Sequence, residues 1–175
     1  MKHAAFATDT TAYLPAVPAR VNTTHLPALG LDLVDASQTQ AIAALLAPGR
    51  RRAYFMNAHC CNIRDTAYAQ AVATADMLLP DGIGVELAGR MTGKRLAANL
   101  NGTDLVPALL AQAASMGKSV YLFGGTPGTA QAAANRLVNT IPDLRIAGTR
   151  DGFAGAADTD AVIHDINDSG ADIVL

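Results

Sequence analysis

The chain has 175 residues, 50% of them hydrophobic, which is enough for one domain with a substantial core and too few for two full domains. Charged residues make up only 16%, the formal net charge is −2, and the longest basic run is Arg50, Arg51 and Arg52. This composition argues against nucleic acid as a partner. We interpret the three arginines as part of a loop that enters a strand, with a contact to anionic lipid headgroups as the alternative.

The two cysteines, Cys60 and Cys61, are neighbours in the chain. Adjacent residues rarely reach the geometry of a disulfide, so the pair fits a reducing cytoplasm. The N-terminal region lacks the continuous apolar core of a signal peptide, and no apolar segment of about 18 residues follows it. We expect a cytoplasmic protein that is soluble or peripherally associated with the cytoplasmic membrane.

Taken in chain order, the sequence predicts a loosely ordered, proline-containing leader over residues 1–27 and regular structure from about Ala28. Strands are predicted over 30–34, 53–57, 77–79, 119–123, 145–148 and 171–175, and helices over 37–46, 61–74, 83–91, 103–116, 128–139 and 158–168. Apolar strands that alternate with amphipathic helices predict an α/β fold: a single Rossmann-like, doubly wound domain over 28–175, with a mostly parallel sheet flanked by helices. Since the last strand ends where a functional loop is expected, we interpret the domain as C-terminally truncated.

The segment YLFGGTPG at 121–128 is a strand that runs into a glycine-rich turn and then a helix. Gly124 and Gly125 allow close backbone approach, Thr126 can cap the helix and donate a hydroxyl, and the helix N-terminus favours an anion such as a pyrophosphate. The segment has neither the dinucleotide fingerprint nor the P-loop spacing, which argues against a dehydrogenase. A purely geometric role for the glycines stays open.

The segment LLPDGIG at 78–84 places Asp81 at the carboxyl end of a strand. In doubly wound folds that edge of the sheet holds the ligand, and a carboxylate there can act as a general base toward a sugar hydroxyl. The alternative is structural: Asp81 as the N-cap of a helix that starts at Gly82.

Asn57 and His59 also follow a strand. The Asn57 amide both donates and accepts hydrogen bonds, which suits recognition of hydroxyl groups. His59 is a candidate acid or base, and with Cys60 and Cys61 it imitates a metal cluster. Consecutive positions cannot supply tetrahedral ligands, so we predict no zinc site.

A turn-rich stretch at 99–104 opens the long helix, which Thr103 or Asp104 can cap. Asn101 and Asp104 are predicted to reach the sugar or the acceptor. The loop at 148–153 is a further strand-end loop of the same kind and the least specific of the set.

Four segments occur in an order that resembles one family: Asn57, PDGIG at 80–84, NGTDL at 101–105 and FGGTPG at 123–128. Over residues 28–175 the chain resembles the WecG/TagA/CpsF glycosyltransferases. The resemblance implies an inverting hexosyl- or N-acetylhexosaminyltransferase that needs no metal or other cofactor. It moves a sugar from a UDP-sugar to a lipid-linked acceptor, typically undecaprenyl-diphosphate-GlcNAc, in surface polysaccharide or wall teichoic acid synthesis.

Carried over by position, the resemblance makes Asp81 the catalytic base and Asn57 an active-site asparagine. The glycine turn at 124–128 then lies where the crevice for the donor is expected. A single displacement needs such a base beside the acceptor hydroxyl and a polarised diphosphate leaving group.

Three features depart from the family pattern. Phe55 stands where many members have Thr, and Asn99 stands where many have Arg, which removes a cation beside the leaving phosphate. Members usually continue into an Ala-Leu-Gly-x-Pro-x-Gln-Glu loop and a basic C-terminal appendage that contacts the membrane. From its absence here we expect the 175-residue chain to bind UDP poorly and to turn over slowly or not at all.

The alternative hypothesis is a non-catalytic UDP-sugar-binding module, although such a module has no evident need for Asp81. N-acetylmannosamine, its uronic acid and glucose are all donor sugars that the resemblance allows. A homo-oligomer is a further expectation from the resemblance.

Overall fold

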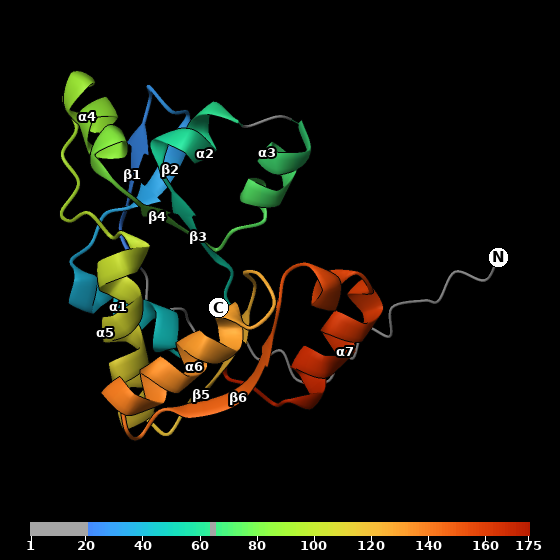
Figure 1. Ribbon diagram of the computed structural model, residues 1–175. Coiled ribbons are helices and arrows are strands. Elements are labelled where there is room, and N and C mark those ends of the chain that lie inside the picture. Colours follow the sequence, from blue (N-terminus) through green and yellow to red (C-terminus); the bar gives the residue numbers. More distant parts are fainter. Residues whose placement is uncertain (1–20, 64–65) are drawn as a thin grey trace. The chain divides into compact units, whose positions relative to one another are not determined.

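The computed structural model describes residues 21–63 and 66–175, which form two compact units that meet in sequence between Gly102 and Thr103. Each unit combines helices with small sheets that include parallel strand pairs (Figure 1). The predicted mixed α/β class is therefore confirmed, whereas the doubly wound arrangement of one continuous sheet stays a prediction. Within the described ranges, no helix is both long enough and apolar enough to cross a bilayer.

The first unit opens with an antiparallel hairpin of β1 (Thr23–Leu26) and β2 (Leu31–Val34). Most of the predicted leader lies outside the described residues, but regular structure starts earlier than Ala28. The reason is that residues 23–26 pair along their whole length with β2, a partner that a local pattern of threonines and prolines does not reveal.

Helix α1 (Gln38–Leu46) follows the hairpin, as predicted. Its start is fixed by a capping box: the Gln40 amide donates to Ser37 Oγ at 3.3 Å, and the Ser37 amide donates to Gln40 Oε1 at 2.9 Å.

The parallel strands β3 (Ala53–Met56) and β4 (Met77–Pro80) complete this unit, with β4 beside β2. Between and after them come α2 (Ala58–Asn62), α3 (Thr66–Ala73) and α4 (Ile83–Met91). The helix predicted over 61–74 is thus two helices. The core consists of residues from the hairpin, β3, α3 and α4: Leu26, Leu33, Met56, Val72 and Val85.

The second unit contains α5 (Gly102–Ser115, beginning at the boundary), α6 (Thr129–Thr140), a 3₁₀ turn η1 (Ala154–Ala156) and α7 (Thr159–Asp168). Its sheet has the order β6-β5-β7 with all strands parallel, formed by β5 (Ser119–Phe123), β6 (Arg145–Arg150) and β7 (Ile173–Val174).

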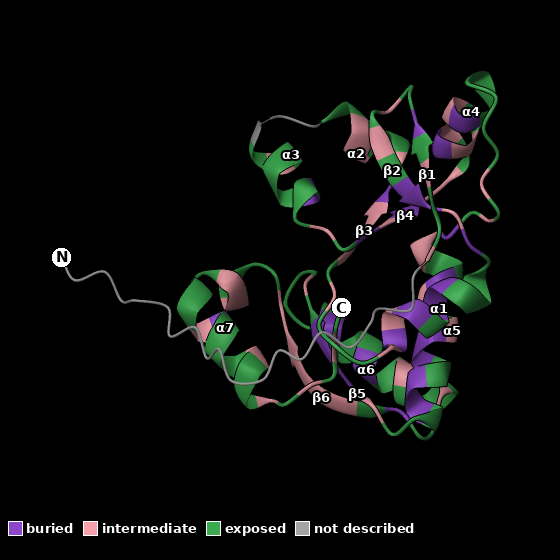
Figure 2. Ribbon diagram, turned by 180° about the vertical axis from the view of Figure 1, so that it is seen from behind, coloured by how far each residue is buried: buried purple, intermediate pink, exposed green. Residues whose placement is uncertain are grey.

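Strand β5 lies in the centre of this sheet, and its first four residues are buried (Figure 2). The surrounding core is aliphatic and consists of Leu110, Ala114, Val120, Leu122, Ala130, Ala134 and Leu144. Strand β6 extends beyond the predicted 145–148, because Thr149 and Arg150 continue to pair with Leu122 and Phe123.

Asp172 fastens β7 to the start of β5. Its carboxylate accepts hydrogen bonds from the Ser119 amide at 2.8 Å and the Ser119 hydroxyl at 3.2 Å, and pairs with Lys118 Nζ at 3.3 Å. These bonds, first among them the one from the Ser119 amide, lower the pKa of Asp172 below its ordinary value.

We predict that Asp172→Asn lowers the free energy of unfolding at neutral pH by about 1 kcal/mol, a modest value because the carboxylate is partly exposed. A depressed folded-state pKa stabilises above the ordinary carboxyl pKa, and this contribution is lost as the pH falls through the lowered pKa. The difference from wild type should therefore shrink in acid, as measured by urea unfolding across acidic to neutral pH. Asp143→Asn, in the exposed turn before β6, is the control, and a difference independent of pH would contradict the prediction.

Candidate active site

The carboxyl ends of β3 and β4 bring two of the predicted site residues together. Met56 pairs with Pro80 at the end of the parallel ladder, so Asn57 and Asp81 follow the two strands at the same edge. The Asp81 amide donates to the Met56 carbonyl at 3.0 Å, which continues the pairing one residue beyond the strands.

Asp81 does not cap the helix that follows it. The N-cap of α4 is Gly82, at φ 90°, and no side chain makes a capping hydrogen bond there. The structural alternative for Asp81 is therefore wrong. The backbone reverses at Gly82 in a conformation that side chains rarely adopt, and Asp81, half-buried, stays at the strand end.

The second glycine of the PDGIG turn is required for packing. A Cβ on Gly84 would lie 2.8 Å from the Cβ of Ala58, so the first turn of α4 touches the first residue of α2. Because α2 directly follows Asn57, this contact fixes the spacing between the two site turns.

Asn57 has a structural role that the sequence analysis missed. It is the N-cap of α2, and its Oδ1 accepts a hydrogen bond from the Cys60 amide at 2.9 Å. The signal was available, since Asn is a preferred N-cap and a short helix can begin immediately after a strand. Recognition of a substrate by Asn57 would therefore rely on its amide nitrogen, since the side-chain oxygen already serves the helix.

The stretch before α5 lies against the PDGIG turn. The Gly82 amide donates to Asn99 Oδ1 at 2.9 Å, and the Leu100 amide donates to the Pro80 carbonyl at 2.8 Å. Asn101, the next residue, is thereby held beside the same strand end. A Cβ on Gly102 would lie 3.6 Å from the Phe55 ring, so the chain passes close over β3.

A pocket of about 240 Å³ opens between this stretch and α4. Its lining residues are Pro80, Gly82, Glu86, Leu96, Ala97, Ala98 and Asn99. Pockets for drug-sized ligands measure roughly 300–1,000 Å³, so this one suits part of a nucleotide sugar rather than the whole molecule.

Asp104 lies in the first turn of α5, which begins at Gly102. Neither Thr103 nor Asp104 is therefore the cap that the sequence suggested. An acidic residue in the first turn is nevertheless favourable, because it faces the positive end of the helix dipole.

The glycine turn after β5 holds the second group of predicted site residues, in the second unit. Gly124, Gly125 and Gly128 have φ values of 132°, 69° and 87°. The turn leads into α6, where Gly128 is the N-cap and no side chain makes a capping bond. Thr126 is not the cap: its hydroxyl lies 2.9 Å from that of Thr129 instead. A helix N-terminus without a side-chain cap is suited to an anion.

The loop after β6, the least specific of the predicted strand-end loops, supports the glycine turn. The Gly124 amide donates to the Arg150 carbonyl and the Gly152 amide to the Gly125 carbonyl, both at 2.9 Å. A Cβ on Gly152 would lie 3.1 Å from Gly124 Cα. Two strand-end loops are thus joined through their backbones.

Asp151 and Arg150 stiffen this loop from the other side. Asp151 Oδ1 accepts from the Gly155 and Phe153 amides, each at 3.0 Å, and these bonds lower the pKa of Asp151. Arg150 donates to the Gly155 carbonyl and pairs with Asp165 at 3.3 Å. The signal was the Asp-x-x-x-Gly spacing, which permits local bonds from a side chain to the backbone.

Tyr121 is buried on β5, and its hydroxyl donates to the Asp165 carboxylate. Burial, followed by this bond, raises the pKa of Tyr121 to about 12, while the same bond lowers the pKa of Asp165. At neutral pH a neutral phenol therefore donates to an ionised carboxylate, which links β5, Arg150 and α7.

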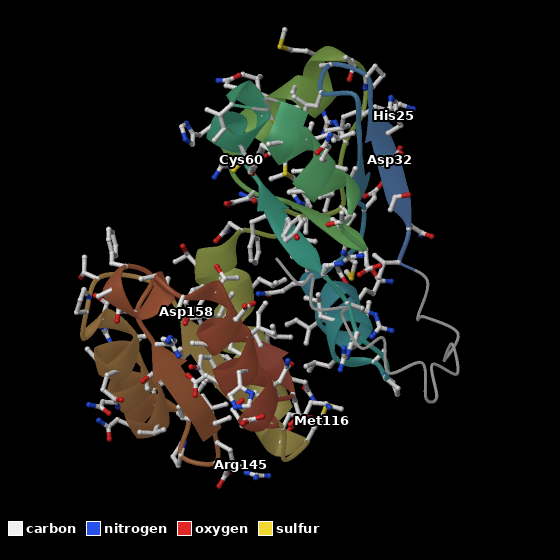
Figure 3. The ribbon with its side chains drawn as sticks, turned by 90° about the vertical axis from the view of Figure 1, so that its right-hand side faces the viewer. His25, Asp32, Cys60, Met116, Arg145 and Asp158 are labelled. Carbon is white, nitrogen blue, oxygen red and sulfur yellow. The ribbon has the colours of Figure 1, made fainter. Side chains whose placement is uncertain are left out.

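The side chains at 59–61 have different surroundings in the structure. His59 is exposed, whereas Cys60 and Cys61 form no disulfide and pack against the core of the first unit. Figure 3 labels Cys60 in this unit. A hydrogen bond with Cys60, together with burial, raises the pKa of Tyr68 to about 12. Among the described residues, no group of three or more His, Cys, Asp or Glu side chains is arranged to hold a metal ion.

Comparison with known proteins adds two findings. The profile of the glycosyl transferase WecG/TagA/CpsF family matches residues 26–175. Two curated relatives, from Bacillus subtilis strain 168 and Bacillus spizizenii strain W23, are each named N-acetylglucosaminyldiphosphoundecaprenol N-acetyl-beta-D-mannosaminyltransferase. They are 31% and 32% identical to this chain over 91 residues, which is 52% of the chain and 36% and 35% of the relatives. The chain thus matches about a third of the length of these relatives.

We predict that Gly84→Ala lowers the free energy of unfolding by about 1–3 kcal/mol, because the added methyl group overlaps Ala58. Ala58→Gly alone should cost about 0.5–1 kcal/mol through helix propensity. The double variant should be more stable than Gly84→Ala, since the overlapping pair is removed. Urea unfolding of the four proteins measures this coupling, and strictly additive effects would show that the contact does not set the spacing of the turns.

Proposed function

The chain belongs to the WecG/TagA/CpsF glycosyltransferase family, and we propose that it transfers a sugar from a UDP-sugar to an undecaprenyl-diphosphate-linked saccharide. The observation that carries the proposal is the position of Asp81. Asp81 follows β4 at the carboxyl edge of a parallel strand pair, beside Asn57. The helix that starts after this turn, α4, is not capped by the Asp81 carboxylate. The names of the two relatives describe the same class of acceptor.

The reaction we propose is one displacement with inversion at the anomeric carbon. A hydroxyl oxygen of the acceptor sugar forms the new bond to that carbon, and the bond from the carbon to the diphosphate oxygen breaks. The hydroxyl proton passes to the Asp81 carboxylate, and UDP leaves with the bonding electron pair. Asp81 is suited to the role of base because it sits at a strand end next to hydrogen-bonding asparagines.

The glycine turn at 124–128 is the proposed site of the donor's diphosphate. Support comes from the positive φ of Gly124 and Gly125 and from the start of α6 without a side-chain cap. Backbone amides and the helix dipole stabilise a diphosphate as charge accumulates on it. Thr126 offers a hydroxyl at the same turn, and its neighbour Thr129 lies within hydrogen-bond distance.

We propose that residues 28–175 form one doubly wound domain. In folds of this class ligands bind at the carboxyl ends of the strands, which is where the Asp81 turn and the glycine turn each lie in their own unit. Asn57, Asn101 and Asp104 are the proposed contacts to sugar hydroxyls. A UDP-sugar-binding module without catalysis is the competing function, and the Asp81 variant below separates the two.

The donor sugar we propose is N-acetylmannosamine, by analogy with the names of the relatives. Its uronic acid and a hexose such as glucose are the other donors to be compared, because a few hydrogen bonds decide among them. Because the proposed acceptor is lipid-linked, we also propose that the protein attaches peripherally to the inner leaflet of the cytoplasmic membrane. Assembly as a homo-oligomer belongs to the same proposal.

We predict that UDP binds this chain weakly but measurably, with or without magnesium, and that NAD does not bind, as measured by calorimetric titration. Gly125→Ala should weaken UDP binding by roughly tenfold or more, since its Cβ would lie 2.8 Å from Thr129 and displace the turn. Gly117→Ala is the matched control: Gly117 has the same φ of 69° but lies in the turn after α5. Equal weakening in both variants, or binding of NAD, would contradict the assignment of the turn.

We predict that Asp81→Asn retains UDP binding but lowers the rate of transfer to GlcNAc-diphosphoundecaprenol by about 10²–10⁴-fold, because the shape is kept and the base is lost. The readout is formation of the glycosylated acceptor from the UDP-sugar. Asp32→Asn, on the exposed face of the β1–β2 hairpin, is the control. Unchanged transfer would remove Asp81 from catalysis, and loss of UDP binding together with folding would make it a structural residue.

A further inference from the structure

Helix α4 exposes three large apolar side chains in a row. Ile83, Leu87 and Met91 are 72%, 55% and 79% exposed, and they follow one another at intervals of four residues. At 3.6 residues per turn this spacing keeps them within about 80° of the helix circumference. They therefore form one continuous stripe, which we call the α4 stripe.

The α4 stripe is not the face that the fold of this unit uses. Val85 and Gly89 are buried on the opposite side of the helix, and a Cβ on Gly89 would lie 3.6 Å from the Leu26 side chain. The helix thus packs through its smaller residues and turns its larger ones outward. Exposing the larger side chains does not stabilise this unit, because they bury no apolar surface in it. A contiguous exposed apolar surface is typical of an interaction site.

Cations accompany the α4 stripe at its C-terminal end. Lys94 and Arg95 are exposed in the turn that follows Met91. That turn is closed by the Lys94 amide, which donates to the Gly89 carbonyl at 2.9 Å. Arg90 forms an ion pair with Glu86 on the helix itself, so Lys94 and Arg95 supply the surplus positive charge. Apolar side chains with basic residues at their border are the pattern of a helix that lies in the interface of an anionic membrane.

We propose that the α4 stripe, with Lys94 and Arg95, is the surface by which this protein lies on an anionic phospholipid bilayer. The orientation follows from the chain: Ile83 is two residues from Asp81, so a bilayer that holds the stripe places the proposed catalytic turn at the lipid surface. In this respect the inference rests on the proposed function, since an acceptor with a polyprenyl diphosphate has its sugar at that depth.

The test uses the fact that the chain contains no tryptophan. Leu87→Trp introduces one fluorophore into the stripe, and Ile163→Trp introduces one at an exposed apolar position of α7 as the matched control. On addition of vesicles of phosphatidylethanolamine and phosphatidylglycerol, the emission of Leu87→Trp should shift to shorter wavelength and that of Ile163→Trp should not. A shift in both proteins, or in neither, overturns the proposal.

Co-sedimentation with the same vesicles gives the second measurement. The triple variant Ile83→Ser, Leu87→Ser and Met91→Ser should bind roughly tenfold or more weakly. The control carries three exposed apolar residues of the second unit changed to serine, Met116, Val138 and Ile163, and should bind as wild type does. Lys94→Ala with Arg95→Ala should weaken binding to these vesicles and leave the weaker binding to phosphatidylcholine vesicles unchanged.

The same variants separate the alternatives. If wild type self-associates in analytical ultracentrifugation and the triple serine variant does not, the stripe is a contact between copies and the proposal fails. Vesicle binding is measured without nucleotide or acceptor, so it is independent of transfer. Loss of vesicle binding with intact UDP binding refutes the membrane surface alone, whereas normal vesicle binding without UDP binding refutes the proposed function alone.

Discussion

The hydrogen bond from the Asp81 amide to the Met56 carbonyl extends a parallel strand pair by one residue, and the site turns of the first unit depend on it. Parallel strands end together, so this bond brings Asn57 and Asp81 out of the sheet at one edge. Gly82 then reverses the chain, and its amide is taken by Asn99. Because backbone groups and Asn99 close the turn, the position of Asp81 is fixed without using its carboxylate as a helix cap.

Backbone hydrogen bonds also hold the glycine turn of the second unit, and an ion pair supports the loop to which the turn is bonded. The backbone of Gly124 and Gly125 is bonded to the loop that begins at Arg150. That loop is in turn held by Asp165, which accepts from the buried Tyr121 hydroxyl and pairs with Arg150. Glycines that adopt positive φ lose conformational entropy on folding, so such a turn needs neighbours that define it. The rigidity of the turn therefore comes largely from residues outside the glycine motif.

Local patterns were sufficient for most elements and insufficient for the contacts between them. Strand β5 and helix α4 occupy the predicted residues, because an unbroken apolar run and a helical period need only nearby sequence. The hairpin strand β1 escaped prediction, since its partner β2, rather than its own composition, makes it a strand. The site residues were found as strand-end polar groups, whereas the capping role of Asn57 needed the true start of α2.

Helix α4 shows most clearly that the spacing of hydrophobic residues along a helix does not by itself determine which face of the helix is buried. Ile83, Leu87 and Met91 form the more hydrophobic of its two stripes, and a rule based on hydrophobicity would turn them inward. The fold instead buries Val85 and Gly89. A Cβ on Gly89 would lie 3.2 Å from the Lys94 carbonyl oxygen, and one on Gly84 would lie 2.8 Å from the Cβ of Ala58, so both positions favour glycine. Gly84 and Gly89 thus decide the rotation of the helix, and the larger side chains are turned outward as a consequence. The close packing that positions Asp81 also creates the exposed apolar surface beside it, so one constraint links the proposed chemistry to the proposed membrane contact.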